Sequence, residues 1–340
     1  PSTGVGTEWH NKTSGEMYIC TDATAGANVW TNVGAGSGDI SPIPHTSGEN
    51  YGFRTGQNAS PNNAIDRYSY SSDGNATDWA DLHFGKVGGC GLSSTTHGYT
   101  GSGGAWGSPA NSAPADNRMD KFPFATQTNS TEVGDMTVGR LYPSGQYTAS
   151  YGWISGGRLN TSNETNVLDR ISFSSDGNAT DWANLAIASY GGSGSSSATH
   201  GYHFGGHSPA HPGGYFNEIQ KFPFASQTNA TDIGDMTVKR WMPGGTSSED
   251  YGYTSGGETP PNSNTIDKFA FASDGNSTGV GTLLAAIYGA AGTQSSTHGY
   301  IHGNQSPGNV IQKYSHVTDG NSADVGDLTT TGVYLSGQQY

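Results

Sequence analysis

One short motif recurs six times along this chain of 340 residues: an aromatic residue or histidine, then glycine, then an aromatic residue. Successive copies lie about 50 residues apart, so the chain repeats one structural unit. The six copies are Tyr51-Gly52-Phe53, His97-Gly98-Tyr99, Tyr151-Gly152-Trp153, His200-Gly201-Tyr202, Tyr251-Gly252-Tyr253 and His298-Gly299-Tyr300.

The residues that follow each motif predict four short β-strands per repeat. In one segment of each repeat, apolar and polar residues alternate, as in Ile266-Asp267-Lys268-Phe269, which places the apolar residues on one face of a sheet. A turn built on asparagine and a closing segment of the type Gly-Asp-Met-Thr complete the unit. Repeats of this size with four strands are typical of β-propeller blades. The sequence therefore predicts an all-β fold with a six-bladed β-propeller over residues 38–340.

The two ends of the repeat region predict how the ring closes. The closing segment at 326–329 has an early counterpart at 38–41, which is followed by Pro42 and Pro44 and so suits the edge of a sheet. We expect the C-terminal strand to pair into the sheet of the first blade, because a closed ring leaves few strand edges exposed.

Composition removes the alternatives to a β-rich fold. The chain has 53 glycines, and only 32% of its residues are hydrophobic and 12% charged, too few for the apolar stripes of a helical bundle. The aromatic content of 11% argues against disorder, and the sequence contains no apolar run long enough to span a membrane. The net charge is −14 and the 14 basic residues are scattered, so we expect no nucleic-acid partner. Cys20 and Cys90 predict two free thiols, with one bridge between them as the alternative.

The repeats resemble those of the kelch family of β-propellers. An apolar strand ending in Gly-Gly, as at 251–257, is followed by an Ile-Asp-Lys-Phe strand and by Gly-Asp-Met-Thr-x-x-Arg, which ends at Arg140 or Arg240 and is similar to the family's Met-Pro-x-x-Arg junction. The family's Tyr-Asp-Pro and Trp positions are only partly matched. The resemblance implies kelch-like blades and no particular function, because one fold serves many functions.

Residues 1–37 lie outside the repeat and predict a β-hairpin module of strand, Thr-Ser-Gly turn, strand, loop and strand. The stretch from Gly6 to Tyr18, together with Trp30 and Val33, resembles a module of bacteriophage tail-fibre and other virion proteins. That module has the pattern Gly-Asp-x-Trp-x-Asn-x-Thr-x-Gly-x-Leu-Tyr, followed by Trp-x-x-Val. The resemblance implies a virion-surface, extracellular setting. Since the chain begins with Pro1, we expect processing or a further upstream portion.

The even-numbered repeats differ from the odd ones by a Ser-rich approach to His97, His200 and His298, which makes the true repeat about 100 residues long and the ring pseudo-threefold. If these histidines faced the axial channel, three imidazoles would converge on a metal or an anion. The preferred interpretation is a hydrogen bond from each histidine to a neighbouring blade. We expect no metal or cofactor, while Ca²⁺ binding by the Asp-Gly-Asn turns stays open.

Two further patterns have plain structural interpretations. His203, His207 and His211 have helical spacing, but intervening glycines and prolines predict a loop. Five Asn-x-Ser/Thr sequences follow the blade period, and we expect their side chains to bond the local backbone rather than to carry glycans. They begin at Asn75, Asn129, Asn178, Asn229 and Asn276.

Positions that break the repeat are the better candidates for binding. Inserted loops are predicted at 102–117, 158–166, 203–216 and 258–264. Trp106, Tyr215, Phe216 and Trp241 supply aromatic rings that can stack on sugars, and a rigid sheet scaffold suits carbohydrate recognition. Simple packing of the loops is the alternative.

The sequence favours a non-enzymatic protein, because most aspartates occupy repeated turns whereas a glycosidase needs two specifically placed carboxylates. We expect a virion-surface or tail-fibre protein that displays the propeller for host attachment by binding a host glycan or receptor. It would contact other virion proteins and form a homo-oligomer. The alternatives are a purely structural propeller, as a capsid decoration or filament subunit, and a glycan-active enzyme.

Overall fold

A computed structural model of the chain describes residues 4–10, 17–23, 29–32, 48–58, 63–104, 116–159, 163–303 and 308–340. The chain divides into two compact units, Pro1–Pro44 and His45–Tyr340. The domain boundary expected after residue 37 falls outside the described residues and stays a prediction.

The N-terminal unit contains a three-stranded antiparallel sheet in the order β1-β2-β3. Trp9 pairs with Tyr18, and Cys20 pairs with Trp30, so the expected sequence of three strands is present. The expected Thr-Ser-Gly turn lies outside the described residues. The strands are β1 (Glu8–His10), β2 (Met17–Asp22) and β3 (Val29–Asn32).

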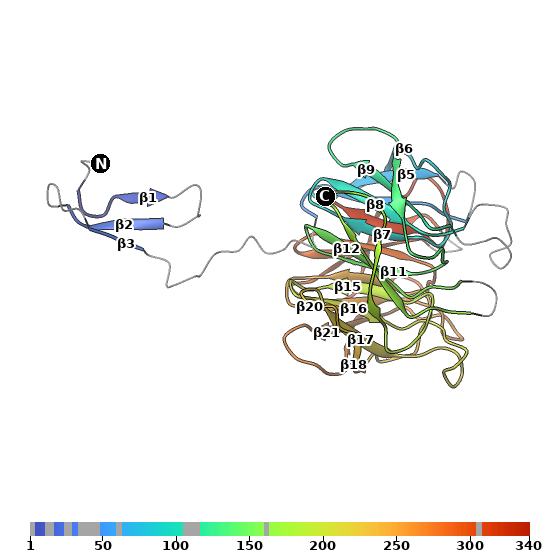
Figure 1. The fold of residues 1–340 in the computed structure, drawn as a ribbon. Helices are drawn as coiled ribbons and strands as arrows, with labels where there is room; N and C mark the ends of the chain where they lie inside the picture. The colour runs from blue at the N-terminus through green and yellow to red at the C-terminus, as the bar shows by residue number, and fades with distance from the viewer. Residues whose placement is uncertain are drawn as a thin grey trace. The chain divides into compact units, whose positions relative to one another are not determined.

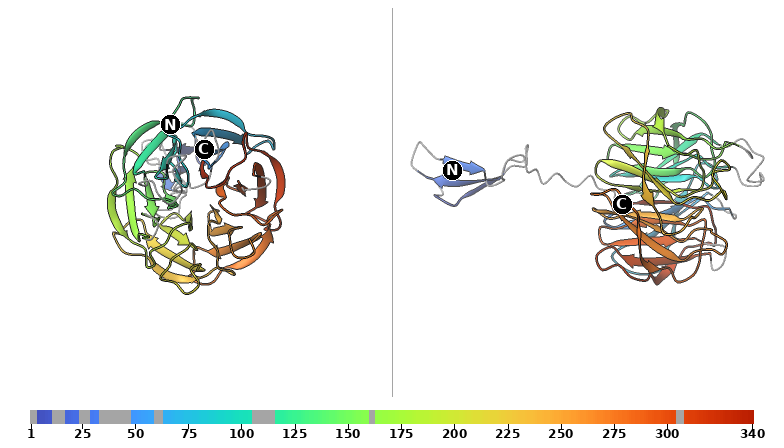
Figure 2. Two further views of the ribbon diagram at one scale, coloured as in Figure 1. Left: turned by 90° about the vertical axis from the view of Figure 1, so that its right-hand side faces the viewer. Right: turned by 90° about the horizontal axis from the view of Figure 1, so that it is seen from below.

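The second unit is a six-bladed β-propeller in which each blade is a four-stranded antiparallel sheet, as the sequence predicted. The ring of blades is seen face-on in the left view of Figure 2 and edge-on in Figure 1. We number the blades from 1 to 6 by their inner strands. These are β27 (Ser336–Gln339), β7 (Cys90–Ser93), β11 (Ser144–Tyr147), β15 (Ser193–Ser196), β19 (Gly244–Ser247) and β23 (Ala291–Gln294).

The inner strands approach one another so closely that the second residue of each has to be glycine. A Cβ atom at any of these six positions would lie 2.1–2.4 Å from the carbonyl oxygen of the equivalent glycine in the preceding blade. Such a contact is far shorter than packed atoms tolerate. The ring of axial glycines therefore sets the width of the channel. Its members are Gly337, Gly91, Gly145, Gly194, Gly245 and Gly292.

The repeated sequence motif begins the second strand of each blade. Its glycine leaves room for the aromatic ring of the third strand: a Cβ on Gly201 would lie 2.2 Å from the Phe222 ring. The second strands are β4 (Tyr51–Thr55), β8 (His97–Gly101), β12 (Tyr151–Ser155), β16 (His200–Phe204), β20 (Tyr251–Ser255) and β24 (His298–His302).

The alternating segment forms the third strand, and its apolar residues pack against the two neighbouring blades. Six hydrophobic clusters result, one at each junction between blades. In one of them Trp153 of blade 3 stacks on Phe224 of blade 4, with ring centroids 4.1 Å apart. The third strands are β5 (Ala64–Ser69), β9 (Arg118–Pro123), β13 (Val167–Ser172), β17 (Glu218–Pro223), β21 (Thr265–Ala270) and β25 (Val310–Ser315).

The outer strand of each blade is covered by the asparagine turn of the following blade. Asn178 Oδ1 of blade 3, for example, accepts the backbone N–H of Asp135 of blade 2 at 3.0 Å. The equivalent bond occurs at every junction, made by Asn75, Asn129, Asn178, Asn229, Asn276 and Asn321. The expectation of local bonds is therefore wrong, because these side chains join neighbouring blades. The outer strands are β6 (Thr77–Asp81), β10 (Thr131–Asp135), β14 (Thr180–Asn184), β18 (Thr231–Asp235), β22 (Thr278–Thr282) and β26 (Ala323–Asp327).

The C-terminal strand closes the ring, as predicted. Strand β27 pairs antiparallel with β4, with Ser336 opposite Thr55 and Gln339 opposite Gly52. Blade 1 is therefore built from both ends of the propeller sequence. This arrangement fastens the first and last repeats within one sheet.

Buried ion pairs join the closing segment of one blade to the third strand of the next. The Arg140 guanidinium donates to the Asp169 carboxylate, and the Thr137 hydroxyl donates to the same carboxylate at 2.7 Å. Both charged side chains are fully buried. This pairing explains the Gly-Asp-Met-Thr-x-x-Arg motif. Arg240, Thr237 and Asp267 form the same set, whereas at the junction of blades 6 and 1 Thr329 bonds Asp66, and the arginine of this pair is Arg54 on β4 of the same blade.

Candidate functional site: the aromatic mouth of the axial channel

The ring has two faces with different connections. On the turn face lie the short turns between inner and second strands, such as 94–96, 148–150 and 197–199. On the loop face lie the longer segments between second and third strands, such as 205–217 and 256–264. The described parts of the loops that the sequence marked as insertions therefore gather on one face.

At the loop face a closed circle of backbone hydrogen bonds surrounds the channel. The residue two places before each inner strand donates its N–H to the carbonyl oxygen of its counterpart in the preceding blade, at 2.6–3.0 Å. In odd blades these residues are Tyr142, Met242 and Tyr334, with left-handed φ of 56°, 52° and 63°. Non-glycine residues rarely adopt this conformation, so the circle holds them in place. Its members are Gly88, Tyr142, Gly191, Met242, Gly289 and Tyr334.

Behind this circle the channel forms a cavity of about 120 Å³ lined by the inner strands and the residues before them. Its turn-face end is occupied by Tyr147 of blade 3, whose hydroxyl accepts a hydrogen bond from Gln339 of blade 1. Gln294 of blade 6, across the ring, also lies within hydrogen-bonding reach of this hydroxyl. The cavity has room for several water molecules or for the end group of a ligand.

The aromatic mouth is the cluster of rings around the loop-face end of this channel. Tyr142 lies 5.2 Å from Tyr334 and 6.4 Å from Trp241, centroid to centroid. Trp241 in turn lies 5.8 Å from Tyr190 and 6.5 Å from Tyr215, nearly parallel to the latter at 17°. The cluster forms one continuous set of ring contacts. Its members are Tyr142, Tyr190, His207, Tyr215, Trp241, Tyr288 and Tyr334.

Aromatic residues are distributed unevenly around the mouth. The residue that directly precedes the hydrogen-bonded circle is aromatic in blades 4, 5 and 6, where it is Tyr190, Trp241 and Tyr288. The equivalent residue is aliphatic in blades 1, 2 and 3, where it is Val333, Val87 and Leu141. At this position the aromatic rings therefore lie on one side of the channel, centred on blade 5.

Glu258 is the carboxylate of this aromatic side. Its backbone pairs with that of Trp241, with N–O distances of 2.7 and 2.9 Å, and the Tyr215 hydroxyl donates to Glu258 Oε1 at 3.0 Å. Burial, together with the Glu258 hydrogen bond and charge, raises the pKa of Tyr215 to about 12. Burial also raises the pKa of Tyr142 to about 12 and raises that of Tyr334. These hydroxyls therefore stay protonated near neutral pH and can donate hydrogen bonds.

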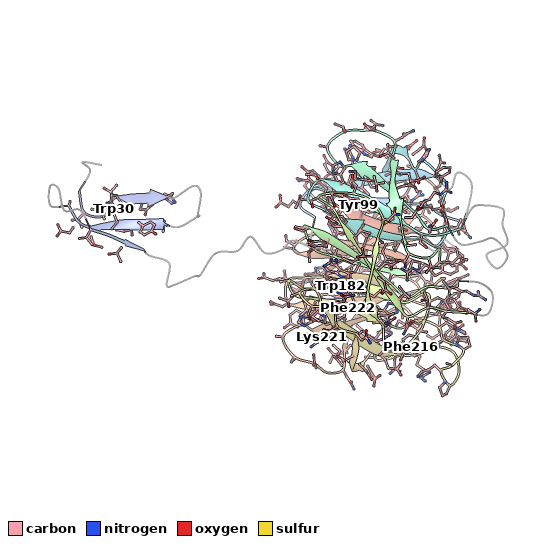
Figure 3. The ribbon with its side chains drawn as sticks, in the orientation of Figure 1. Trp30, Tyr99, Trp182, Phe216, Lys221 and Phe222 are labelled. Atoms are coloured by element: carbon pink, nitrogen blue, oxygen red, sulfur yellow. The ribbon has the colours of Figure 1, made fainter. Side chains whose placement is uncertain are left out.

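The structure brings together two of the four aromatic residues singled out in the sequence. Tyr215 and Trp241 are neighbours in the mouth, and both are half-buried. Phe216 is completely buried among packed side chains (Figure 3), so its ring is not open to a ligand. Trp106 lies outside the described residues.

Sequence reasoning missed the tyrosines at the channel entrance and Glu258. A signal existed, because the positions before the inner strands alternate between glycine and a large residue, as at Gly88 and Tyr142. Only the structure shows that these positions meet around the axis.

The histidines of the even repeats begin strands β8, β16 and β24 and are absent from the described channel lining. Each ring Nδ1 lies 2.8 Å from the hydroxyl of its preceding threonine: His97 from Thr96, His200 from Thr199 and His298 from Thr297. The bonds found are thus local and not to a neighbouring blade. In the part of the chain that the structure describes, no group of three or more His, Cys, Asp or Glu side chains could hold a metal ion.

The other histidine series occupies three different environments. His203 is buried on β16 and contacts Ser144, Ser155 and Ser189. His207 joins the aromatic mouth, and His211 Nε2 lies 2.9 Å from Glu218 Oε1. The expected loop is present over residues 205–217, which contain neither a helix nor a strand, but the expectation is wrong for His203, which lies on strand β16.

Other predicted features were also located. Cys20 and Cys90 are free and buried. The aspartates of the Asp-Gly-Asn turns pair with lysines of the preceding blade, for example Asp319 with Lys268 at 3.0 Å. The described residues include no helix that is long and apolar enough to cross a membrane.

Comparisons with known proteins give no family to guide the assignment. No protein-family model matches the chain, and a search of curated proteins finds no similar sequence. The functional argument therefore depends on the site.

Proposed function

We propose that this protein is a non-catalytic display propeller whose aromatic mouth binds carbohydrate on a host surface. The observation that carries the proposal is the concentration of aromatic rings, of which Tyr215, Trp241 and Tyr334 are half-buried, with hydroxyl donors and one carboxylate, at the open end of an axial cavity. Aromatic faces that cover the apolar side of a sugar, with a few polar groups around them, form a common type of carbohydrate site.

The positions of the chain entry and of the mouth on opposite faces of the propeller support a role in display. The chain enters the described propeller at the turn face, where the Gly48 N–H donates to the Gln294 carbonyl at 2.8 Å. The mouth lies on the opposite face. An attachment through the N-terminal segment therefore leaves the mouth open to a ligand.

The virion assignment extends this proposal. It depends on the resemblance of residues 1–37 to tail-fibre modules, and it would make other virion proteins the partners of the N-terminal unit. Antibodies against the propeller should label intact virus particles at their surface, and labelling of disrupted particles alone would contradict this part of the proposal.

A glycan array tests the binding function. The full chain should bind a subset of surface glycans, and Trp241→Ala should abolish that binding. Trp182→Ala is the matched control, because Trp182 packs under Arg170 on the wall of blade 3, away from the mouth.

The outcomes separate the three classes of function. Binding that survives Trp241→Ala would contradict the assignment of the site. A chain that binds no glycan but forms regular arrays under the electron microscope would favour a structural subunit. Release of reducing ends from a bound polysaccharide would show an enzyme.

A further inference from the structure

Glu258 gives the aromatic mouth a negative centre. One carboxylate oxygen accepts the Tyr215 hydroxyl, and Glu258 forms no ion pair within the described ranges. Its negative charge contributes to a higher pKa in five surrounding rings. These are Tyr190, His207, Tyr215, Tyr288 and Tyr334.

The balance of charge at the mouth is negative. The charged side chains that act on its rings are Arg158, Glu164 and Glu258. Burial lowers the pKa of His207, which favours its neutral form. Among the described residues, one positive charge at the mouth is thus outweighed by two negative ones.

Among the described residues, the cation already present at the mouth shows how the rings accommodate positive charge. The Arg158 guanidinium lies over the face of Tyr190, 5.0 Å from the ring centroid. The corresponding faces of Trp241, Tyr288 and Tyr334, around Glu258, have no such cation over them in the described structure. A cation above these rings would gain both the ring quadrupole and the carboxylate charge.

We infer that the ligand carries a positively charged ammonium group, which binds beside Glu258 against the rings of Trp241, Tyr288 and Tyr334. The inference rests on the proposed carbohydrate function and narrows it to saccharides that bear a free amine or a quaternary ammonium substituent. A carboxylated or sulfated sugar would meet repulsion from Glu258, and a neutral sugar would make no use of its charge.

Titrations with defined probes test the inference. We would titrate the full chain, by calorimetry, with glucosamine oligomers, with the matching N-acetylglucosamine oligomers and with choline. The amine oligomers or choline should bind at least about tenfold more tightly than the N-acetylated oligomers, because acetylation removes the charge.

Substitutions then assign the charge to Glu258. Glu258→Gln keeps an oxygen that accepts the Tyr215 hydroxyl, so the fold should persist, yet ammonium binding should weaken by about tenfold or more. Glu164→Gln is the matched control, because it removes an equal charge from the same face beside Arg158, and it should change affinity by less than about threefold. Thermal unfolding checks that both variants are folded.

The source of the ammonium group is distinguished by pH. Raising the pH from about 6 to about 9 neutralises a sugar amine but not choline, so oligomer binding should fall while choline binding remains. Neutral sugars that bind through Trp241 and are indifferent to Glu258→Gln would overturn the ammonium inference and leave the carbohydrate function standing. A chain that binds none of the probes and no glycan on the array would overturn both.

Discussion

The junctions between blades and the aromatic mouth use one repeated scaffold in opposite ways. At the junctions the same residue meets the same requirement in every blade, as the axial glycines and the asparagines of the outer wall show. At the mouth, equivalent positions carry different residues in different blades, and at the position directly before the hydrogen-bonded circle the aromatic residues fall on blades 4 to 6. Residues that keep the repeat are thus explained by the ring, and those that depart from it are candidates for binding a ligand.

The physical character of the two regions differs as well. The junctions contain buried groups whose partners are supplied by the neighbouring blade, so removal of one partner leaves the other buried and unsatisfied. The mouth contains rings whose centroids lie 5.2–6.5 Å apart, and several of them, such as Trp241 and Tyr334, are only half-buried. Substitutions at the junctions should therefore reduce stability, and substitutions at the mouth should reduce binding.

The largest loss of stability is expected at the buried ion pairs. Arg140→Met leaves the Asp169 carboxylate buried without its cation, which should cost about 3–5 kcal/mol of unfolding free energy in urea denaturation. Arg118→Met is the matched control, because Arg118 pairs with Asp116 while its side chain is 33% exposed. Its loss should cost less than about 1 kcal/mol. Equal losses in the two variants would contradict the special role of the junction.

The axial glycines should come next. Gly145→Ala places a Cβ 2.3 Å from the Gly91 carbonyl oxygen, so the inner strands must move apart. We expect a loss of about 1–3 kcal/mol from this overpacking. Gly279→Ala on the outer strand of blade 5 is the control, because its nearest neighbour would be 3.8 Å away. A Gly145→Ala variant as stable as Gly279→Ala would show that the inner strands can accommodate a Cβ atom at residue 145.

A buried histidine should make the junction of blades 1 and 6 sensitive to acid. His302 is fully buried, and neither ring nitrogen has a hydrogen-bond partner among the described residues. Burial lowers its pKa to about 3 from 6.5. Below about pH 6.5 the His302 imidazole binds a proton in the unfolded chain but stays neutral in the folded protein. The stability of the folded state is therefore lost progressively as the pH falls from about 6.5 toward about 3.

The variant His302→Phe tests this sensitivity, since Phe204 occupies the equivalent position in blade 4. At about pH 5 the variant should be about 1–2 kcal/mol more stable relative to its own value at pH 7 than the wild type is. Urea denaturation at the two pH values gives the comparison. Parallel pH profiles for the two proteins would exclude His302 as the cause.

The fold could be predicted from the sequence because the repeated residues are the ones that make the repeated packing contacts. The glycine of each motif and the alternating third strand predicted blades, and the surplus closing segment predicted β27 in the sheet of blade 1. The partners of the asparagines were predicted incorrectly. A side chain such as Asn178 bonds residue 135 of another blade, and no local pattern encodes a contact between blades.

The candidate site was predictable only in part for a related reason. Tyr215 and Trp241 were found because they break the repeat near an inserted loop. Tyr142 and Tyr334 are 192 residues apart in the sequence. Only closure of the propeller ring brings their ring centroids within 5.2 Å of each other.

 The sequence places them in blades 3 and 1, and the structure makes them neighbours across the channel entrance.

The smallest effect on stability separates the repeated asparagines from those outside the blade period. Asn178→Ala removes the bond to the Asp135 N–H, which should cost about 1 kcal/mol because one hydrogen bond between neighbouring blades is lost. Asn163→Ala is the control: Asn163 is exposed in a loop-face segment, and its loss should cost less than about 0.5 kcal/mol. Urea denaturation of both variants measures the difference. If Asn163→Ala lost more unfolding free energy than Asn178→Ala, stability would depend on residues that the repeat does not require. The contrast between stabilising junctions and loop-face residues that contribute little to stability would then be wrong.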